Sequence, residues 1–296
     1  MRFVLAGASG FLGSALRDRL ARDGHEVVRL VRGTPQSANE SRWDPYVGRV
    51  DQSVIDDADV VVCLSGAPLA HWPWTASYKR TFTDSRVLPT RTLAEAVAAS
   101  WRQPAFVAQN GIAGYGDQGE TVLTEEADTT APTFMGEVTR RWEEATRPAA
   151  EAGARVVVLR TSVVLDRRGG ALKPLLLVFR AGLGGPVGSG EQYFSTISAH
   201  DWVRAVSFLA ADPQCAGAFN VSGPNATTNA EFGRELAGLL HRPAAVRVPS
   251  LPIRTALPDI SSELLSSARV EPARLTAAGF RFDHPTLRDR LGAALG

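Results

Sequence analysis

Cysteine, excess charge and long apolar runs are all scarce in this sequence of 296 residues. Two cysteines, Cys63 and Cys215, can build neither a disulfide framework nor a zinc-binding spacing, so we expect no bound metal. A net charge of +1 gives no field that would attract nucleic acid or an anionic membrane. No apolar run approaches the roughly 20 residues that cross a bilayer, and no signal peptide is visible. We therefore expect a cytoplasmic protein whose partner is a small molecule, and leave a homodimer open.

The first half of the chain alternates apolar segments with amphipathic ones. Strands are predicted at Arg2–Ala6, Glu26–Val31, Asp59–Leu64, Ala105–Gln109 and Arg155–Leu159, and helices at Phe11–Arg22, 75–100 and 136–152. This alternation implies right-handed crossovers between parallel strands. It predicts an α/β fold of the Rossmann type, with a doubly wound parallel sheet.

The second half is less regular. A helix is expected at 201–211, a strand at 218–221, and a further helix that ends near Leu240. Thr228 should cap this last helix, with Glu231 completing a capping box. We expect residues 1–165 to form the dinucleotide-binding domain, with its sheet completed by 201–222. Residues 166–200 and 223–296 should form a small C-terminal α+β lobe.

A glycine turn joins the first strand to the first helix and reads Gly7-Ala8-Ser9-Gly10-Phe11-Leu12-Gly13. In this context Gly7 allows a tight turn, Gly10 lets the backbone approach a pyrophosphate, and Gly13 lets the helix pack on the strand. The first turn of the helix offers unpaired N–H groups to the phosphates. The turn predicts dinucleotide binding, whereas the alternative is a turn retained only for packing.

The end of the second strand, Val31-Arg32-Gly33, points to NADP(H) as the cofactor. NAD(H) sites usually place an acidic residue here to accept hydrogen bonds from the ribose. Arg32 cannot accept such a bond, but its guanidinium can hold a 2′-phosphate with two N–H groups. An unrelated surface arginine is the alternative.

Further motifs make the chain resemble a known group. They are Leu64-Ser65-Gly66-Ala67, Trp74, Ser85-Arg86, Gly114-Tyr115-Gly116-Asp117, Arg141-Trp142-Glu143, the segment Leu159 to Leu165 and the glycine-rich segment Gly182 to Gly190. Together they resemble the atypical extended short-chain dehydrogenase/reductases. Within these, they are similar to the NAD(P)-dependent epimerase/dehydratase family proteins that end in a domain of the DUF1731 type. The resemblance covers essentially the whole chain and fixes no reaction.

The resemblance implies further residues beside the cofactor. Leu64, Ser65 and Gly66 should line it, and Val163 should approach the nicotinamide. Arg86 should point toward the cofactor as well, unless it instead pairs with Asp84 or Glu95.

The usual catalytic residues of the wider superfamily are missing from their positions. Those enzymes use a Ser or Thr, a Tyr, and a Lys four residues after the Tyr. The Tyr and Lys positions correspond here to Met135 and Thr139, neither of which can exchange a proton usefully. The Ser position corresponds to Asn110, which can donate a hydrogen bond to a carbonyl but cannot act as a base.

Three features leave their roles open. Tyr115 is either a proton donor, with Asn110 polarising a carbonyl, or a packing anchor. The family resemblance implies a histidine where Ser198 stands, and His200, two positions later, is either an acid/base beside Asp201 or a surface residue. The Gly182–Gly190 loop is either flexible or held close to a ligand.

Two functions follow from these observations. The first is an NADP(H)-dependent oxidoreductase or epimerase acting on a small polar carbonyl or hydroxyl compound. The alternative is a non-catalytic NADP(H)-binding sensor or partner-binding protein that lacks the Tyr–Lys pair. We set aside a structural domain without a cofactor, because the glycine turn has its full strand–helix–strand context.

Overall fold

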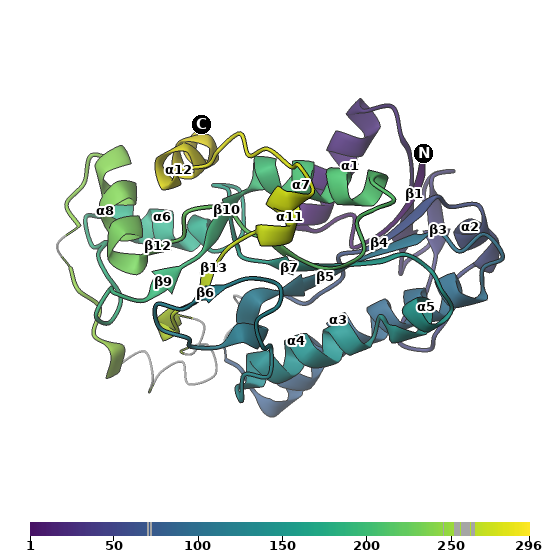
Figure 1. Cartoon of the computed structure of the whole chain (residues 1–296), viewed down its shortest axis with the longest axis horizontal. Coiled ribbons are helices and arrows are strands. Elements are labelled where there is room, and N and C mark those ends of the chain that lie inside the picture. The colour runs from purple at the N-terminus through teal and green to yellow at the C-terminus, as the bar shows by residue number, and fades with distance from the viewer. Residues whose placement is uncertain (70, 72, 245, 252–254, 256–260, 262–263) are drawn as a thin grey trace. The chain divides into compact units, whose positions relative to one another are not determined.

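A computed structural model describes residues 1–69, 71, 73–244, 246–251, 255, 261 and 264–296 (Figure 1). The chain folds into two compact units, and each is assembled from separate stretches of sequence. The first unit consists of Met1–Asn110, Arg140–Leu159 and Val203–Ala218, and the second of Gly111–Thr139, Arg160–Trp202 and Phe219–Gly296.

The regular elements follow one another along the chain as strands, helices and one 3₁₀ turn. They are β1 (Arg2–Ala6), α1 (Phe11–Arg22), β2 (Glu26–Val31), β3 (Glu40–Arg42), α2 (Gln52–Asp56), β4 (Val60–Cys63), α3 (Ala76–Ala99), β5 (Ala105–Gly111), η1 (Ile112–Tyr115), β6 (Val122–Leu123), α4 (Phe134–Glu144), α5 (Arg147–Glu151), β7 (Val156–Thr161), β8 (Val163–Leu165), α6 (Leu172–Arg180), β9 (Tyr193–Phe194), β10 (Thr196–Ser198), α7 (Ala199–Ala211), β11 (Gly217–Val221), β12 (Thr227–Thr228), α8 (Asn229–Leu239), β13 (Arg269–Val270), α11 (Ala273–Ala277) and α12 (Leu287–Leu295).

The main sheet has seven strands in the order β11-β7-β5-β4-β1-β2-β3. From β1 the chain first winds outward through β2 to β3, then returns to β4 on the other side of β1 and winds outward again. This reversal between β1 and β4 is the switch point of a doubly wound α/β sheet. The predicted α/β fold with a parallel, Rossmann-type sheet is therefore confirmed.

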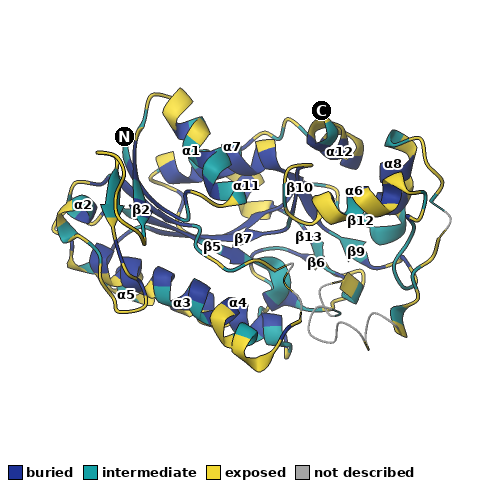
Figure 2. Cartoon of the chain, turned by 180° about the vertical axis from the view of Figure 1, so that it is seen from behind, coloured by how far each residue is buried: buried dark blue, intermediate teal, exposed yellow. Residues whose placement is uncertain are grey.

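The central strands β1 and β4 are apolar because helices cover both faces of the sheet there. All four residues of β4 are buried, as the uninterrupted apolar run predicted. Figure 1 shows α1 on one face of these strands and α3 with α5 on the other. A buried cluster under α3 and α5 includes Val4, Val28, Leu30, Trp43 and Leu93. Figure 2 shows the buried residues of α3 on the side that faces the strands.

One predicted helix is divided in the structure. We expected a single helix over 136–152, but α4 ends at Glu144 and α5 begins at Arg147. Pro148 explains the break, because it stands at the start of α5 and has no N–H for a hydrogen bond to the preceding turn. The expectation of one continuous helix is wrong.

The described residues of the second unit form three two-stranded sheets, which pair β10 with β8, β12 with β9, and β13 with β6. Helices α6, α8 and α12 bury a common apolar cluster, which includes Leu172, Leu236 and Leu291. The predicted capping box of Thr228 and Glu231 is present at the start of α8 and is confirmed. Among the described residues, no helix is long and apolar enough to span a bilayer.

Candidate functional site

The glycine turn folds as tightly as the sequence predicted. Gly7 has a φ of +80°, and a Cβ at this position would lie 2.7 Å from the carbonyl carbon of Leu64. The N–H of Gly10 donates to the carbonyl of Gly7 at 3.0 Å, which closes the turn. A Cβ at Gly13 would lie 2.1 Å from that same carbonyl oxygen, so only glycine lets α1 approach β1 this closely.

The start of α1 suits a phosphate-bearing ligand. Gly10 is the N-cap residue and supplies no side chain to the first N–H groups of the helix. The first turn of α1 carries no acidic residue, and Ser9 and Gly10 are exposed. A Cβ at Gly10 would meet only the Gly7 carbonyl within 4 Å, which leaves its outer side open. These uncapped N–H groups and the helix dipole favour an anion, so the residues present fit a pyrophosphate.

The carboxyl end of β2 presents Arg32 to solvent. Val31 is the last residue of the strand and is half-buried, whereas Arg32 is exposed. Within the described part of the chain, the Arg32 side chain makes no hydrogen bond or ion pair. A cationic group is therefore available at the corner of the sheet where dinucleotide sites place the adenosine ribose.

Leu64, Ser65 and Gly66 follow β4 and lie against the glycine turn. The backbone of Leu64 and Ser65 lies within about 3 Å of the position that a Cβ of Gly7 would occupy. The N–H of Ala67 donates to Ser85 Oγ at 2.8 Å, which ties this segment to α3. The structure thus brings two of the predicted cofactor segments together at neighbouring strand ends.

Arg86, on α3, is hydrogen-bonded to the segment that follows β4. Its Nη2 donates to the Ala67 carbonyl and its Nη1 to the Phe82 carbonyl, both at 3.0 Å. The guanidinium lies 3.5 Å from the centre of the Phe82 ring and 5.3 Å from that of Trp142. Burial lowers the pKa of Arg86 to about 10. Within the described residues it pairs with neither Asp84 nor Glu95, so the predicted alternative of an ion pair is wrong.

The residues at the usual catalytic positions are buried. Asn110 is 1% exposed and donates from Nδ2 to Glu143 Oε2 at 3.4 Å. Met135 is 8% exposed in α4, and the hydroxyl of Thr139 donates to the Gly136 carbonyl at 2.9 Å. A Cβ at Gly114 would lie 3.1 Å from Thr139 Oγ1, so this threonine packs against the turn that leads to Tyr115.

Tyr115 lies in a buried polar network of the second unit. Its hydroxyl donates to Asn220 Oδ1 at 2.7 Å and accepts from Arg160 Nη1 at 3.1 Å. Arg160 also donates to the carbonyl of Glu125, whose carboxylate accepts from the backbone N–H of Asn220. The side chain is 1% exposed, and burial raises the pKa of its hydroxyl. These contacts suit a packing anchor, and a role in proton transfer stays a prediction.

Comparison with known families agrees with the glycine turn and the sheet. The model of the NAD-dependent epimerase/dehydratase family matches residues 3–222, and that of a domain of unknown function, DUF1731, matches residues 248–294. The chain belongs to the NAD-dependent epimerase/dehydratase family. It is thus a protein of the short-chain dehydrogenase/reductase type, as the motifs predicted.

Relatives match over nearly the whole chain. Epimerase family protein Mb2239 of Mycobacterium bovis is 39% identical over 292 residues, which cover 98% of this chain and 96% of the relative. Epimerase family protein SDR39U1 of Bos taurus is 35% identical over 306 residues, with 100% and 98% coverage.

Solved structures of family members share this fold. The human epimerase family protein SDR39U1, crystallised with NADPH, superposes with a TM-score of 0.91 at 30% identity, covering 100% of this chain and 99% of that one. A nucleoside-diphosphate sugar epimerase from Corynebacterium glutamicum gives a TM-score of 0.82 at 32% identity, covering 100% of this chain and 58% of that one.

In this chain, the Gly182–Gly190 loop is hydrogen-bonded to a second backbone segment, residues 246–248. The N–H of Gly188 donates to the Val248 carbonyl at 2.9 Å, and the N–H of Val248 donates to the Pro186 carbonyl at 3.0 Å. A Cβ at Gly185 would lie 2.1 Å from the Val246 carbonyl oxygen. The close backbone approach is therefore made by the chain itself, and the alternatives of a flexible loop and of a loop close to a ligand both stay predictions.

Val163 belongs to the second unit, where it pairs with Thr196 in the parallel β8–β10 sheet. Its predicted place beside the nicotinamide stays a prediction. Ser198, at the end of β10, is buried and its hydroxyl lies 2.8 Å from Nδ1 of His284. A histidine from a distant part of the chain therefore contacts the residue that stands where the family resemblance implied one. His284 was not predicted as a site residue, because nothing in the sequence pattern links it to position 198.

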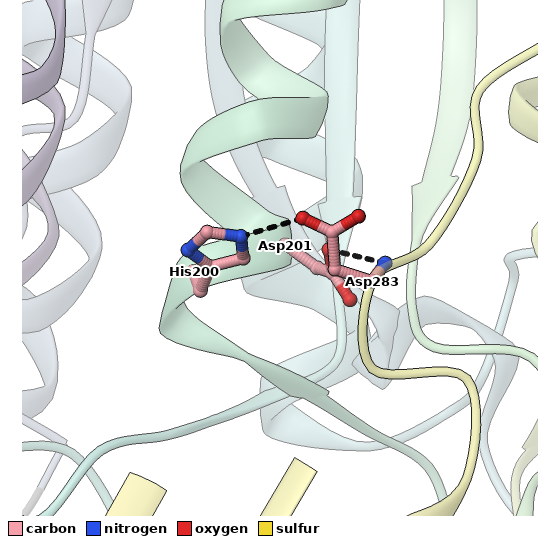
Figure 3. A group of neighbouring side chains, drawn as sticks. All are labelled: His200, Asp201 and Asp283. Atoms are coloured by element: carbon pink, nitrogen blue, oxygen red, sulfur yellow. Dashed lines mark hydrogen bonds and ion pairs between the residues drawn. The ribbon is translucent and has the colours of Figure 1, made fainter. Parts of the chain in front are cut away.

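His200, Asp201 and Asp283 form a cluster at the start of α7 (Figure 3). His200 Nε2 lies 2.8 Å from Asp283 Oδ2, and both side chains are about half exposed. Asp201 is fully buried, and its two carboxylate oxygens accept the backbone N–H groups of Asp283 and His284 at 3.0 and 2.8 Å. The cluster is thus built around a carboxylate that fixes a loop.

Proposed function

We propose that this chain binds NADP(H) in preference to NAD(H) and transfers a hydride to or from a small polar compound that carries a carbonyl or hydroxyl group. The observation that carries the proposal is Arg32, an exposed arginine without a partner among the described residues, at the strand end where dinucleotide sites usually place the adenosine ribose. A carboxylate at this position would repel a 2′-phosphate, whereas a guanidinium binds it. The NADPH in the human relative with 30% identity supports the choice.

The chain's own residues divide the task of holding the cofactor. Gly7, Gly10 and Gly13 shape the turn, and the first N–H groups of α1, from Phe11 and Leu12 onward, would receive the pyrophosphate. Leu64 to Gly66 would line the cofactor on the side of β4. When bound, the nicotinamide supplies hydride transfer, and the protein supplies position and electrostatics.

Tyr115 and Asn110 are the proposed proton donor and carbonyl polariser. Each is 1% exposed, and each already has a hydrogen-bond partner inside the protein. A catalytic role therefore requires Tyr115 to exchange Asn220 for a substrate oxygen. Burial raises the pKa of the hydroxyl, so the phenol would stay protonated until it meets a substrate but would be a weaker acid than a free tyrosine.

A second candidate function is a non-catalytic NADP(H)-binding sensor. It is favoured by Met135 and Thr139 at the Tyr and Lys positions, since neither side chain can lower the pKa of a phenol or hold a nicotinamide ribose. In both candidates the ligand is a small molecule, and we propose no nucleic-acid or membrane partner.

The cofactor proposal is tested by titration with NADPH and NADH. We expect NADPH to bind at least tenfold more tightly, and Arg32→Glu to abolish this preference by weakening NADPH alone. Arg91→Glu, at an exposed position of α3, is the matched charge control and should leave the preference intact. Equal affinities of the unmodified protein for the two cofactors would refute the proposal.

Turnover separates the enzyme from the sensor. The protein is mixed with NADPH and a panel of carbonyl compounds and sugar nucleotides, and loss of nicotinamide absorbance is followed. Turnover that collapses in Tyr115→Phe, while NADPH affinity persists, supports the enzyme and the proposed acid. Tight binding without turnover across the panel supports the sensor.

A further inference from the structure

The third strand brings a second arginine to the corner of the sheet that holds Arg32. β3 pairs with β2 in parallel, and Arg42, its last residue, stands in register with Val31, the residue before Arg32. Carboxyl ends of neighbouring parallel strands meet at one edge of a sheet. The three-residue strand that positions Arg42 had no counterpart among the predicted strands.

The pleat of β3 shows which way Arg42 points. Its neighbour Trp43 is 3% exposed and belongs to the core cluster on the α3 side, together with Leu30. Successive side chains of a strand point to opposite faces, so Arg42 points to the α1 side. Glu40, two residues earlier, lies on that side too, because it pairs with Arg29 at 2.9 Å.

The α1 side is also the side of the pyrophosphate site. Arg29 and Val27 of β2 line a shallow pocket together with Arg17 and Ala21 of α1, which places these alternate β2 residues under α1. The glycine turn leads into the N-terminus of that same helix. Arg42 thus shares its face and its edge of the sheet with the cofactor-binding turn.

The charge of Arg42 is available to a ligand. Its side chain is exposed and has no hydrogen bond or ion pair within the described residues, as is true of Arg32. The acidic groups nearby are engaged elsewhere. Glu40 accepts from Arg29 and from the N–H of Gln36, and Asp44 accepts the N–H of Tyr46 at 3.0 Å.

We infer that Arg42 and Arg32 together form the binding site for the 2′-phosphate of NADP(H). A phosphate monoester carries about −1.5 to −2 charges at pH 7, which two guanidinium groups match and one does not. The inference rests on the proposed NADP(H) preference and deepens it by naming a second residue that determines cofactor specificity. It also assigns a function to β3, whose register holds Arg42 at the edge.

The test measures binding of adenosine 2′,5′-bisphosphate and of 5′-AMP by calorimetry, alongside NADPH and NADH. We expect Arg42→Gln to lower the affinity for the bisphosphate and for NADPH about tenfold, and to leave the affinities for 5′-AMP and NADH unchanged. Arg42→Lys should lose less, because it keeps the charge without the planar pair of donors. Arg91→Gln removes an exposed positive charge from α3 and should change none of the four affinities.

The possible results distinguish a failure of the Arg42 assignment from a failure of the proposed NADP(H) preference. If Arg32→Gln weakens NADPH and Arg42→Gln does not, the second arginine is refuted and the NADP(H) preference stands. If the unmodified protein binds the bisphosphate no better than 5′-AMP, both are refuted. Because the Arg42 side chain is exposed and has no partner in the described part of the chain, we expect each Arg42 variant to unfold at the temperature of the unmodified protein. A shift of several degrees with weakened 5′-AMP binding would also overturn the assignment.

Discussion

Arg86 binds the carbonyl of Ala67 while its guanidinium stacks 3.5 Å from the centre of the Phe82 ring. Arg86, which the sequence predicted to lie beside the cofactor, thus donates its N–H groups to the protein's own backbone carbonyls. A Cβ at Gly66 would lie 3.2 Å from the guanidinium carbon, so Arg86 and the segment after β4 are packed together. Its effect on a ligand would be exerted through the position of residues 65–67.

Replacing Arg86 should therefore lower the affinities for NADPH and NADH by the same factor. We expect Arg86→Met to lower the unfolding free energy by about 1–3 kcal/mol, since the Ala67 carbonyl loses the Arg86 donor and the stacking on Phe82 is lost. NADPH and NADH affinities should fall by the same factor in titration. Arg80→Met, at an exposed position of the same helix, is the control. A loss confined to NADPH would show that Arg86 touches the 2′-phosphate directly.

The packing of the glycine turn is tested by adding a single methyl group. Gly13→Ala would place a Cβ 2.1 Å from the Gly7 carbonyl oxygen, so α1 must move away from β1. We expect a loss of at least about 2 kcal/mol, measured by denaturant unfolding. Gly33→Ala meets nothing within 4 Å and should lie within about 0.5 kcal/mol of the unmodified protein. Equal stability of the two variants would contradict this account of the turn.

The Gly182–Gly190 loop should be equally intolerant at one position. Gly185→Ala would bring a Cβ to 2.1 Å from the Val246 carbonyl oxygen and force the two backbone segments apart. Hydrogen exchange at Gly188 and Val248, whose N–H groups bond across the pair, should speed up by at least about tenfold. Gly238→Ala, in α8 with open space around it, should leave this exchange unchanged.

Long apolar segments and glycines were the parts of this fold that sequence reasoning could predict. β1, α1 and β2 lie where expected, because strand burial and the glycine turn leave strong local patterns. The three-residue β3 left none, since Glu40, Ser41 and Arg42 form a strand only by pairing with β2. Three residues are too few for a pattern of alternating polar and apolar side chains to distinguish a strand from a loop.

The candidate site was predictable for the cofactor turn and far less so for individual side chains. The glycines act through backbone geometry, which their own sequence determines. Arg86 and Tyr115 instead take their roles from distant partners, Trp142 for one and Asn220 for the other. Such long-range pairs have no signal in a single sequence.

Acid should weaken the turn after β8 through Asp166. Burial raises the pKa of Asp166, but hydrogen bonds from the side chain and backbone of Arg168 together hold that pKa below its ordinary value of 3.8. The stabilisation is therefore complete above the unfolded value and lost as pH falls through the folded one. Because the Arg168 side chain is 73% exposed, we expect at most about 1 kcal/mol. When the unfolding free energy is measured as a function of pH, it should fall less below pH 4 in Asp166→Asn than in the unmodified protein.

Asp201 should matter for stability and not for metal binding. Asp201→Ala removes the acceptor of two backbone N–H groups and should cost about 2–4 kcal/mol. Asp283→Ala removes an exposed carboxylate that contacts His200 and should cost less than Asp201→Ala. EDTA should leave the melting temperature of the unmodified protein unchanged. A drop of several degrees in EDTA would instead identify the cluster as a cation site.

The interleaving of the two units along the chain has a consequence for biosynthesis. Because the first unit needs Val203–Ala218, it cannot be completed until residue 218 has left the ribosome. The second unit begins at Gly111 but waits for Leu287–Leu295, the helix that contributes to its apolar cluster. A nascent chain would thus hold the unfinished parts of both units at once, and it would expose their apolar residues until α12 has emerged.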